Sequence, residues 1–255
     1  MRMPAKVRDI LALVDGIAPF ADAEEWDNVG LLAGNPDAPV ERVLCALDLT
    51  EEALDEAMSR DAQLIVTHHP ILFRGRKNLC ETDAEGRLLC RLVRANIAMI
   101  AAHTNYDFAC PGVNDALASA VGLRKNVVVE RILRVGVPEE GTLAGFAARV
   151  ERALGGPVRV YGNADAELRR VAVVGGSGGD YVEIARQAGA DALLTGEISY
   201  HRATDAAANG LCVLEAGHAA TEHPGICALA KGLQIAADAV EYNIRVFDSQ
   251  ARLFL

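Results

Sequence analysis

The six histidines of this 255-residue chain lie in four short motifs, three of which also contain carboxylate side chains. Imidazole and carboxylate groups are ligands for zinc, iron, manganese and nickel, so their grouping indicates one shared metal site. The motifs are Thr67-His68-His69-Pro70, His103-Thr104-Asn105-Tyr106-Asp107, Glu197-Ile198-Ser199-Tyr200-His201 and His218-Ala219-Ala220-Thr221-Glu222-His223. Metal binding is therefore the first functional hypothesis.

The adjacent histidines follow a short apolar run that ends at a proline. Residues 64–66 form the run, and Pro70 cannot donate to the hydrogen-bond ladder of a strand. His68 and His69 are therefore expected where a strand leaves its sheet. At such a bent end, adjacent imidazoles can bind different metals or flank one metal. Two hydrogen-bonded loop histidines are the alternative.

His103 and Asp107 follow a second apolar run, residues 97–102. Open α/β sheets usually place their ligands at the carboxyl ends of strands, which is where both residues are expected. Asp107 can bridge two cations, or it can cap a turn ahead of Gly112. His103 can be a ligand, can orient a ligand, or can carry a proton.

His218 and Glu222 are spaced to share one face of a helix, within reach of the same ion. The motif matches no zincin signature. An exposed polar pair near a helix start is the alternative. Glu197 and His201 have the same spacing and are expected to project together towards the metals, or else to form a surface ion pair.

Taken together, the motifs that follow apolar runs supply His68, His69, Asp107, His218 and Glu222. This is more ligands than a catalytic site for a single zinc ion uses. Two metal ions that share a carboxylate and a bridging water would use the whole set and leave positions open for a substrate.

Two further segments contain groups suited to a binding site. The glycine run at residues 175–179 could hold an anion with its amides, but it matches no phosphate-binding fingerprint, and a tight turn before a helix starting near Asp180 is preferred. The only tryptophan, Trp26, is predicted to lie in the core, with Asp27 and Asn28 as polar groups of a pocket.

Apolar runs alternate with amphipathic segments through the first half of the chain. Strands are predicted at 43–47, 64–66 and 97–102, and helices at 51–60, 86–96 and 113–121. This alternation is typical of a parallel sheet covered by helices on both faces.

The pattern changes after Gly122, where a second domain is expected. Its strands are predicted at 126–137, 158–161, 171–174 and 192–195, with a helix at 142–154. A later strand is predicted at 211–214, in the segment expected to return to the first domain. We therefore predict an α/β fold with two α/β domains, the first having a mostly parallel sheet completed by the C-terminal segment. The predicted domains are residues 1–124 with 211–255, and residues 125–210.

The composition limits the classes of partner. With 35 acidic and 25 basic residues the net charge is −10, which opposes non-specific binding to nucleic acid or to anionic lipid. Residues 1–20 lack the uninterrupted apolar core of a signal peptide, and no run approaches the roughly 20 apolar residues of a membrane span. The six cysteines include no Cys-x-x-Cys pair and are expected to be reduced, as in a cytoplasmic protein.

These motifs, in this order, resemble the dinuclear-metal-centre family of the NGG-interacting factor three type. Many bacterial members of that family carry the name GTP cyclohydrolase I type 2. The resemblance covers residues 26–225 and is most specific at 26–30, 67–70, 103–107, 195–197 and 217–225.

The resemblance implies that His68, His69, Asp107, His218 and Glu222 are the ligands of two divalent metal ions per subunit, which could be Zn, Fe, Mn or Ni. It also implies a ring-shaped homohexamer with metal sites facing an inner cavity. The spacing of the motifs corresponds to the short form of the family, without an extra central domain. In many relatives an aspartate stands at the position of Glu197, so the resemblance assigns no settled role to this carboxylate, which is one methylene longer.

The resemblance further implies a hydrolase with a small-molecule substrate. In the cyclohydrolase reaction, metal-activated water attacks C8 of the guanine ring of GTP, and the products are formate and 7,8-dihydroneopterin triphosphate. His103, Glu197 and His201 are then the predicted catalytic residues that move protons. Hydrolysis of a phosphoester or an amide fits the metals equally well. A non-catalytic ring that binds metal or a regulatory protein partner is the alternative.

Overall fold

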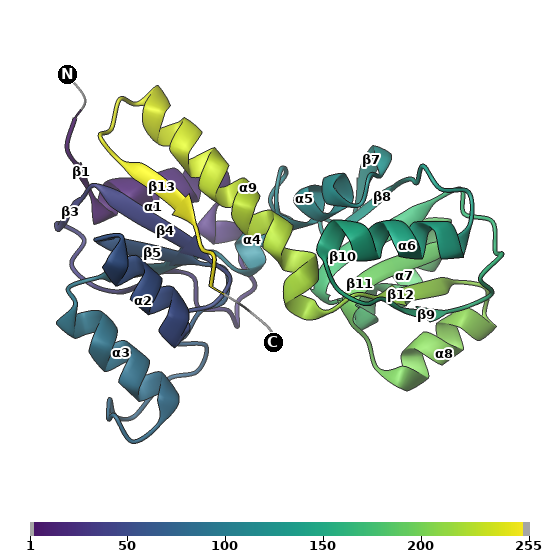
Figure 1. Cartoon of the computed structure of the whole chain (residues 1–255), viewed down its shortest axis with the longest axis horizontal. Coiled ribbons are helices and arrows are strands. Elements are labelled where there is room, and N and C mark those ends of the chain that lie inside the picture. The colour runs from purple at the N-terminus through teal and green to yellow at the C-terminus, as the bar shows by residue number, and fades with distance from the viewer. Residues whose placement is uncertain (1–2, 252–255) are drawn as a thin grey trace. The chain divides into compact units, whose positions relative to one another are not determined.

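The computed structural model describes residues 3–251, which divide into two units. Among these residues, unit 1 contains 3–109 and 226–251, and unit 2 contains 110–225. Both units combine sheets with helices, so the predicted α/β class with parallel strands is confirmed. Figure 1 shows the elements of both units along the chain.

Unit 1 is built on a five-stranded sheet with the order β13-β4-β5-β6-β2. Strands β13, β4, β5 and β6 run parallel, and β2 pairs antiparallel with β6. The C-terminal strand therefore completes the sheet of the first unit. The strands are β2 (Gly30–Ala33), β4 (Arg42–Ala46), β5 (Leu64–Thr67), β6 (Ala98–Ala101) and β13 (Arg245–Asp248), with a separate pair of β1 (Ala5–Lys6) and β3 (Pro39–Val40).

Helices cover this sheet because its strands are apolar on both faces. Leu44, Ile65 and Met99 pack against Leu54 of α2 and Leu92 of α3 on one face, where Figure 1 shows both helices. The helices of unit 1 are α1 (Val7–Ile17), η1 (Phe20–Asp22), α2 (Glu51–Ser59), α3 (Ala84–Arg94) and α4 (Thr104–Phe108). Helix α9 (His218–Ala239) begins in unit 2 and continues in unit 1.

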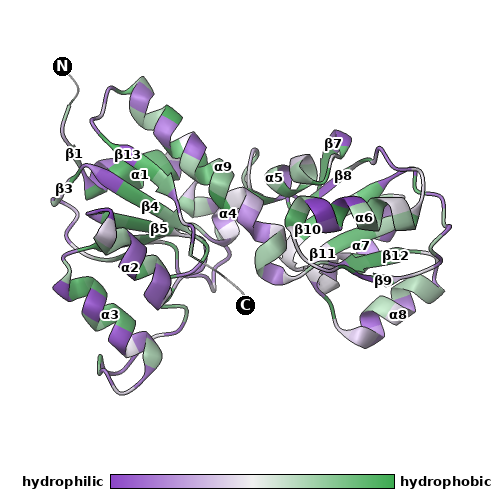
Figure 2. Cartoon of the chain, viewed as in Figure 1, coloured by the Kyte–Doolittle hydropathy of each residue, from purple (hydrophilic) through white to green (hydrophobic). Residues whose placement is uncertain are grey.

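Unit 2 is built on a six-stranded sheet with the order β7-β8-β10-β11-β12-β9. Strands β10, β11 and β12 run parallel, and the strands at both edges are antiparallel. The strands are β7 (Arg124–Val129), β8 (Leu133–Val137), β9 (Arg159–Tyr161), β10 (Val171–Ser177), β11 (Ala192–Glu197) and β12 (Cys212–Glu215). Figure 2 shows β10 and β11, like β4 and β5 in unit 1, as largely hydrophobic.

The core of unit 2 lies between its sheet and two helices. Leu117 of α5 and Phe146 of α6 pack on Val173, Leu194 and Leu214 from the three parallel strands. The helices of this unit are α5 (Val113–Ala120), α6 (Leu143–Leu154), η2 (Gly179–Tyr181), α7 (Val182–Gln187) and α8 (Tyr200–Ala208).

The unit borders differ from the predicted ones at 124/125 and 210/211. The first border lies earlier because α5 buries Leu117 in the core of unit 2. The second lies later because β12 pairs with β11 and β9 inside the second sheet. Both differences reflect pairing and packing between segments distant in sequence, which local apolar patterns do not reveal.

The strand predicted at residues 126–137 is wrong. The segment forms the hairpin of β7 and β8, and Glu130 and Arg131 at its turn have positive φ angles of 48° and 65°. These two charged residues interrupt the apolar run, which was an available sign of a turn. Strand β10 also extends through the first glycines of the 175–179 run, as far as Ser177.

No helix within residues 3–251 is long and apolar enough to cross a membrane.

The fully buried side chain of Arg134 makes a two-pronged ion pair with Asp115, with nitrogen–oxygen distances of 2.8 and 2.7 Å. Breaking a buried pair leaves a poorly solvated charge, so Arg134→Met is expected to lower the free energy of unfolding by about 3 kcal/mol. Urea denaturation measures this change. Arg152→Met, at an exposed position of α6, is the matched control, and equal losses in the two variants would contradict the assigned role.

Candidate metal centre

Three histidines gather at the carboxyl ends of two neighbouring parallel strands in unit 1. Strand β5 is followed by His68 and His69, and β6 is followed after one residue by His103. The register pairs Thr67 with Ala101, which brings these two strand ends side by side. One ring nitrogen from each histidine lies within 4.8 Å of the others. Three imidazoles so close together can share a metal ion.

The Nδ1 atom of each of these rings faces an oxygen acceptor. The acceptors are the Ala102 carbonyl at 2.9 Å from His68, Asp48 at 2.8 Å from His69 and Asp27 at 2.9 Å from His103. A ring that donates its Nδ1 proton to oxygen keeps Nε2 as the atom that can bind a metal or take up a proton. Such an arrangement suits histidines that could bind a metal ion.

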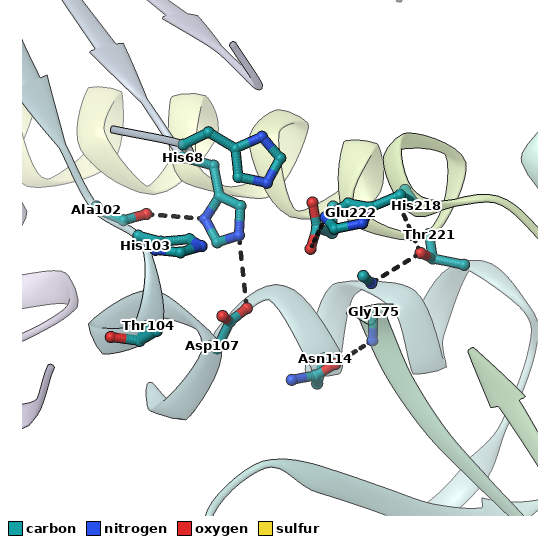
Figure 3. A network of polar contacts seen from close by, with 12 residues as sticks. His68, Ala102, His103, Thr104, Asp107, Asn114, Gly175, His218, Thr221 and Glu222 are labelled. Atoms are coloured by element: carbon teal, nitrogen blue, oxygen red, sulfur yellow. Dashed lines mark hydrogen bonds and ion pairs between the residues drawn. The ribbon is translucent and has the colours of Figure 1, made fainter. Parts of the chain in front are cut away.

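Asp107 is the carboxylate of this group. It lies on the short helix α4, which starts directly after His103. One of its oxygens is 3.6 Å from Nε2 of His68, and Figure 3 shows the two side chains facing each other. The structure therefore brings all four predicted site residues of unit 1 to one strand-end cluster.

Asp27 supports His103 with a carboxylate that has no exposed area. Besides facing His103, it accepts hydrogen bonds from the amide and the hydroxyl of Thr104, at 3.0 and 2.6 Å. Burial alone would raise the pKa of Asp27, but hydrogen bonds from His103 and Thr104 hold it well below its usual range. Asp27 is therefore an anion at neutral pH.

Asp27 and Asp48 both support histidines, but the sequence analysis identified only one of them. Asp27 was predicted as a polar pocket group, without its histidine partner. Asp48 was missed, although it follows β4 just as the histidines follow their strands. The rule that ligands gather at the carboxyl ends of strands would have found it. Trp26, predicted to lie in the core, is 59% exposed, which corrects that prediction.

A second group of donors lies in unit 2, at the start of α9. Nε2 of His218 is 3.3 Å from an oxygen of Glu222, one helical turn later. Nδ1 of the same ring is 3.3 Å from Glu197 at the end of β11. The predicted one-face arrangement of His218 and Glu222 is what α9 produces. Glu197 holds the far side of the His218 ring, as an orienting group does.

The glycine run of unit 2 fits closely against these donors. The Gly175 amide donates to Asn114 at 2.8 Å (Figure 3), and the Gly176 amide donates to the Thr221 hydroxyl at 3.1 Å. These amides are occupied by side chains, so they do not form an anion cradle. A Cβ atom on Gly176 would lie 2.2 Å from a Glu222 oxygen, so glycine lets the strand approach the carboxylate.

His201 does not join its predicted partner. Glu197 ends a strand, whereas His201 lies on α8 after the capping residue Ser199, so the two residues do not share a helix face. His201 is exposed, and its ring lies against Tyr200 with centroids 5.5 Å apart. The predicted catalytic role of His201 therefore has no support within unit 2.

The donor chemistry of both groups fits divalent metal ions. Unit 1 offers oriented imidazoles with Asp107, and unit 2 offers an imidazole with Glu222 one turn away. Mixed nitrogen and carboxylate donors suit zinc, iron, manganese and nickel. The chain thus carries histidine and carboxylate groups that could hold a metal.

Comparison with known proteins identifies the family of the chain. The family model described as Duf34/NIF3 (NGG1p interacting factor 3) matches residues 5–252. The chain belongs to this family. A GTP cyclohydrolase 1 type 2 homolog of Clostridium acetobutylicum is 33% identical over 97% of each chain. One of Streptomyces coelicolor is 37% identical over 96% of this chain and 91% of the relative.

A solved structure agrees with this membership. The Bacillus cereus protein related to NIF3 superimposes with a TM-score of 0.93, at 26% identity, over 98% of both chains. The predicted family resemblance is therefore confirmed, and the NIF3 fold is shared over 98% of the chain.

Gly176→Ala is expected to weaken the metal affinity of this NIF3-family protein about tenfold or more, because the added methyl group displaces Glu222. Metal content after dialysis against a graded chelator measures the change. Gly155→Ala is the matched control, since Gly155 also has a positive φ angle, 75°, but a Cβ there meets nothing within 4 Å. Equal metal retention in both variants would refute the close-packing role of Gly176.

Asp27→Asn is expected to cost about 2 kcal/mol of unfolding free energy near neutral pH, because the ionic acceptor of His103 is lost. The folded-state pKa of Asp27 lies below the ordinary value of 3.8. Its stabilisation is therefore present above that pH and is lost as the pH falls through the lower folded-state value.

Urea denaturation of both proteins between about pH 7 and about pH 3 measures this difference. Asp205→Asn, at an exposed position of α8, is the control. A difference between Asp27→Asn and the native protein that disappears well above pH 4 would contradict the lowered pKa.

Proposed function

We propose that this NIF3-family protein is a hydrolase that uses two divalent metal ions, with His68, His69, Asp107, His218 and Glu222 as their ligands. The observation that carries the proposal is the convergence of three imidazoles whose Nδ1 atoms all face oxygen acceptors. In histidines oriented in this way, Nε2 is the nitrogen that can bind a metal ion or take up a proton. The homohexamer stays a prediction of the family resemblance.

Divalent ions bound by these side chains would supply Lewis acidity and lower the pKa of water towards neutrality. The surrounding residues have separate tasks. Asp48 and the Ala102 carbonyl keep the His69 and His68 rings in orientation. Glu197 does the same for His218 from the end of β11.

His103 is the proton carrier in this proposal. The ionised Asp27 carboxylate accepts a hydrogen bond from Nδ1–H, so Nε2 of His103 is the atom that takes a proton from water and returns it to the leaving group. Asp27 is a positioning residue, since it acts through His103. Its two bonds from Thr104 keep the carboxylate itself from turning.

GTP is the substrate that the relatives' names support, since both are called GTP cyclohydrolase 1 type 2 homologs. In that reaction one water adds to C8 of the guanine ring and opens the ring to a formamide, and a second water releases C8 as formate. The ribose carbons then close the new ring with loss of one water. The product is 7,8-dihydroneopterin triphosphate. His103 would remove the proton from the attacking water and protonate the ring nitrogen released from C8.

Formate release from GTP, by protein reconstituted separately with zinc, iron, manganese and nickel, tests this function. Loss of a group that only orients a metal ligand typically costs up to roughly 100-fold. Because His218 is a proposed ligand itself, His218→Ala is expected to reduce formate release by more than that. His201→Ala is the matched histidine control, and it should stay within about twofold of the native rate because His201 is exposed on α8.

Two outcomes would contradict the proposal. A Glu222→Ala protein with full metal content and full turnover would exclude the assigned ligands. Protein shown to hold two ions per chain that releases no formate with any of the four metals would exclude GTP. If the protein binds metal but turns over neither GTP nor phosphoesters nor amides, a non-catalytic metal-binding or regulatory role would be favoured.

A further inference from the structure

A second feature of unit 1 is a pocket of about 720 Å³ beside the histidine group. Its walls come from strand β2, helix α3 and the segment that joins β5 to α3. Such a volume is typical of a small-molecule site. None of the proposed metal ligands lines it.

The joining segment is held at both ends. The side-chain amide of Asn28 donates to the Leu72 carbonyl at 2.6 Å. Further along, Arg76 is paired with Asp83 at 2.8 Å and with Glu85 at 3.0 Å, so its charge is already balanced. The pocket wall between these anchors therefore has a defined shape.

The pocket has an apolar wall and an aromatic edge. Leu32, Leu79 and Leu89 line it together with Phe73, which is 46% exposed. The ring of Trp26 packs edge-on against Phe73, with centroids 5.7 Å apart. Tryptophan is highly buried on average, so an exposed pair of aromatic rings beside a pocket indicates a surface that a flat ring can cover.

Two cations in the same wall lack a counter-charge. Arg74 and Lys77 are both exposed and line the pocket, and neither makes an ion pair or a side-chain hydrogen bond within the described residues 3–251. The one lining aspartate, Asp27, is already bonded by His103 and Thr104. In a chain of net charge −10, these two cations form a local site for an anion.

The pocket adjoins the histidine group. Asp27 lines it while accepting from His103, and the rings of Phe73 and His103 have centroids 6.2 Å apart. A molecule with its ring on Phe73 would therefore lie next to the proposed proton carrier. This neighbourhood makes the pocket the natural place for the substrate of the proposed function.

We infer that this pocket binds a planar aromatic ring that carries a phosphate, with the ring against Phe73 and the leucines and the phosphate between Arg74 and Lys77. The inference rests on the proposed function for its role, since it assigns the positions at which the ring and the phosphate of that centre's substrate bind. Binding itself needs no turnover, so it can be tested separately. Arginine and lysine side chains are standard phosphate partners.

The only tryptophan, Trp26, touches Phe73, so its fluorescence reports on the pocket. Native protein is titrated with guanosine 5′-monophosphate, guanosine, inorganic phosphate and an aromatic carboxylate, and calorimetry repeats each titration. The monophosphate is expected to bind saturably and at least about tenfold more tightly than guanosine or phosphate alone.

Arg74→Ala combined with Lys77→Ala is expected to weaken binding of the monophosphate roughly tenfold or more, and Phe73→Leu should weaken the nucleoside as well. Arg87→Ala combined with Lys231→Ala removes the same two residue types from exposed positions outside the pocket wall, so it should leave the affinity unchanged. Circular dichroism checks that each variant is folded.

Several outcomes would overturn the inference. The first is that neither method detects binding of the monophosphate, and the second is that the Arg74 and Lys77 changes leave its affinity intact. The others are that phosphate alone binds as tightly as the monophosphate, or that the aromatic carboxylate binds more tightly than it. Failure of the hydrolase is a separate result, because it would appear as absent formate release with the binding pattern intact.

Discussion

The parallel pairing of β4, β5 and β6 is the constraint on which the centre in unit 1 depends. Its register aligns the carboxyl ends of the three strands, so the residues that follow them meet. Asp48 follows β4, His68 and His69 follow β5, and His103 follows β6. A shift of one residue in this pairing would turn these side chains to the other face of the sheet.

Hydrogen bonds then fix which nitrogen of each histidine ring faces its acceptor. A free imidazole can present either nitrogen, but each ring of the cluster has an oxygen beside Nδ1. The acceptors differ in charge: His68 faces a neutral carbonyl, whereas His69 and His103 face carboxylates. A carboxylate partner fixes the ring orientation and keeps the proton on Nδ1, which suits both a metal ligand and a proton carrier.

In unit 2 the donor side chains are positioned by close packing as well as by strand ends. Gly176 brings β10 against Glu222, and the Thr221 hydroxyl accepts from the same glycine. A carboxylate confined in this way has few rotamers to choose from, so less entropy is lost when it binds an ion. Arg74 and Lys77 of the unit 1 pocket show the reverse case, because they have no charged partner within residues 3–251 and are available to a ligand.

The sequence by itself determined the donors, the family and the α/β class, because residue type and the apolar runs ahead of each motif are local properties. His68, His103 and Asp107 could be placed at strand ends from those runs alone. Tertiary structure decided the rest: the Asp48 and Asp27 acceptors, the contact of Glu197 with His218, the exposure of Trp26 and the unit borders. Each of these depends on which distant segments pair or pack together, and that choice is made by the whole chain when its apolar surfaces are buried.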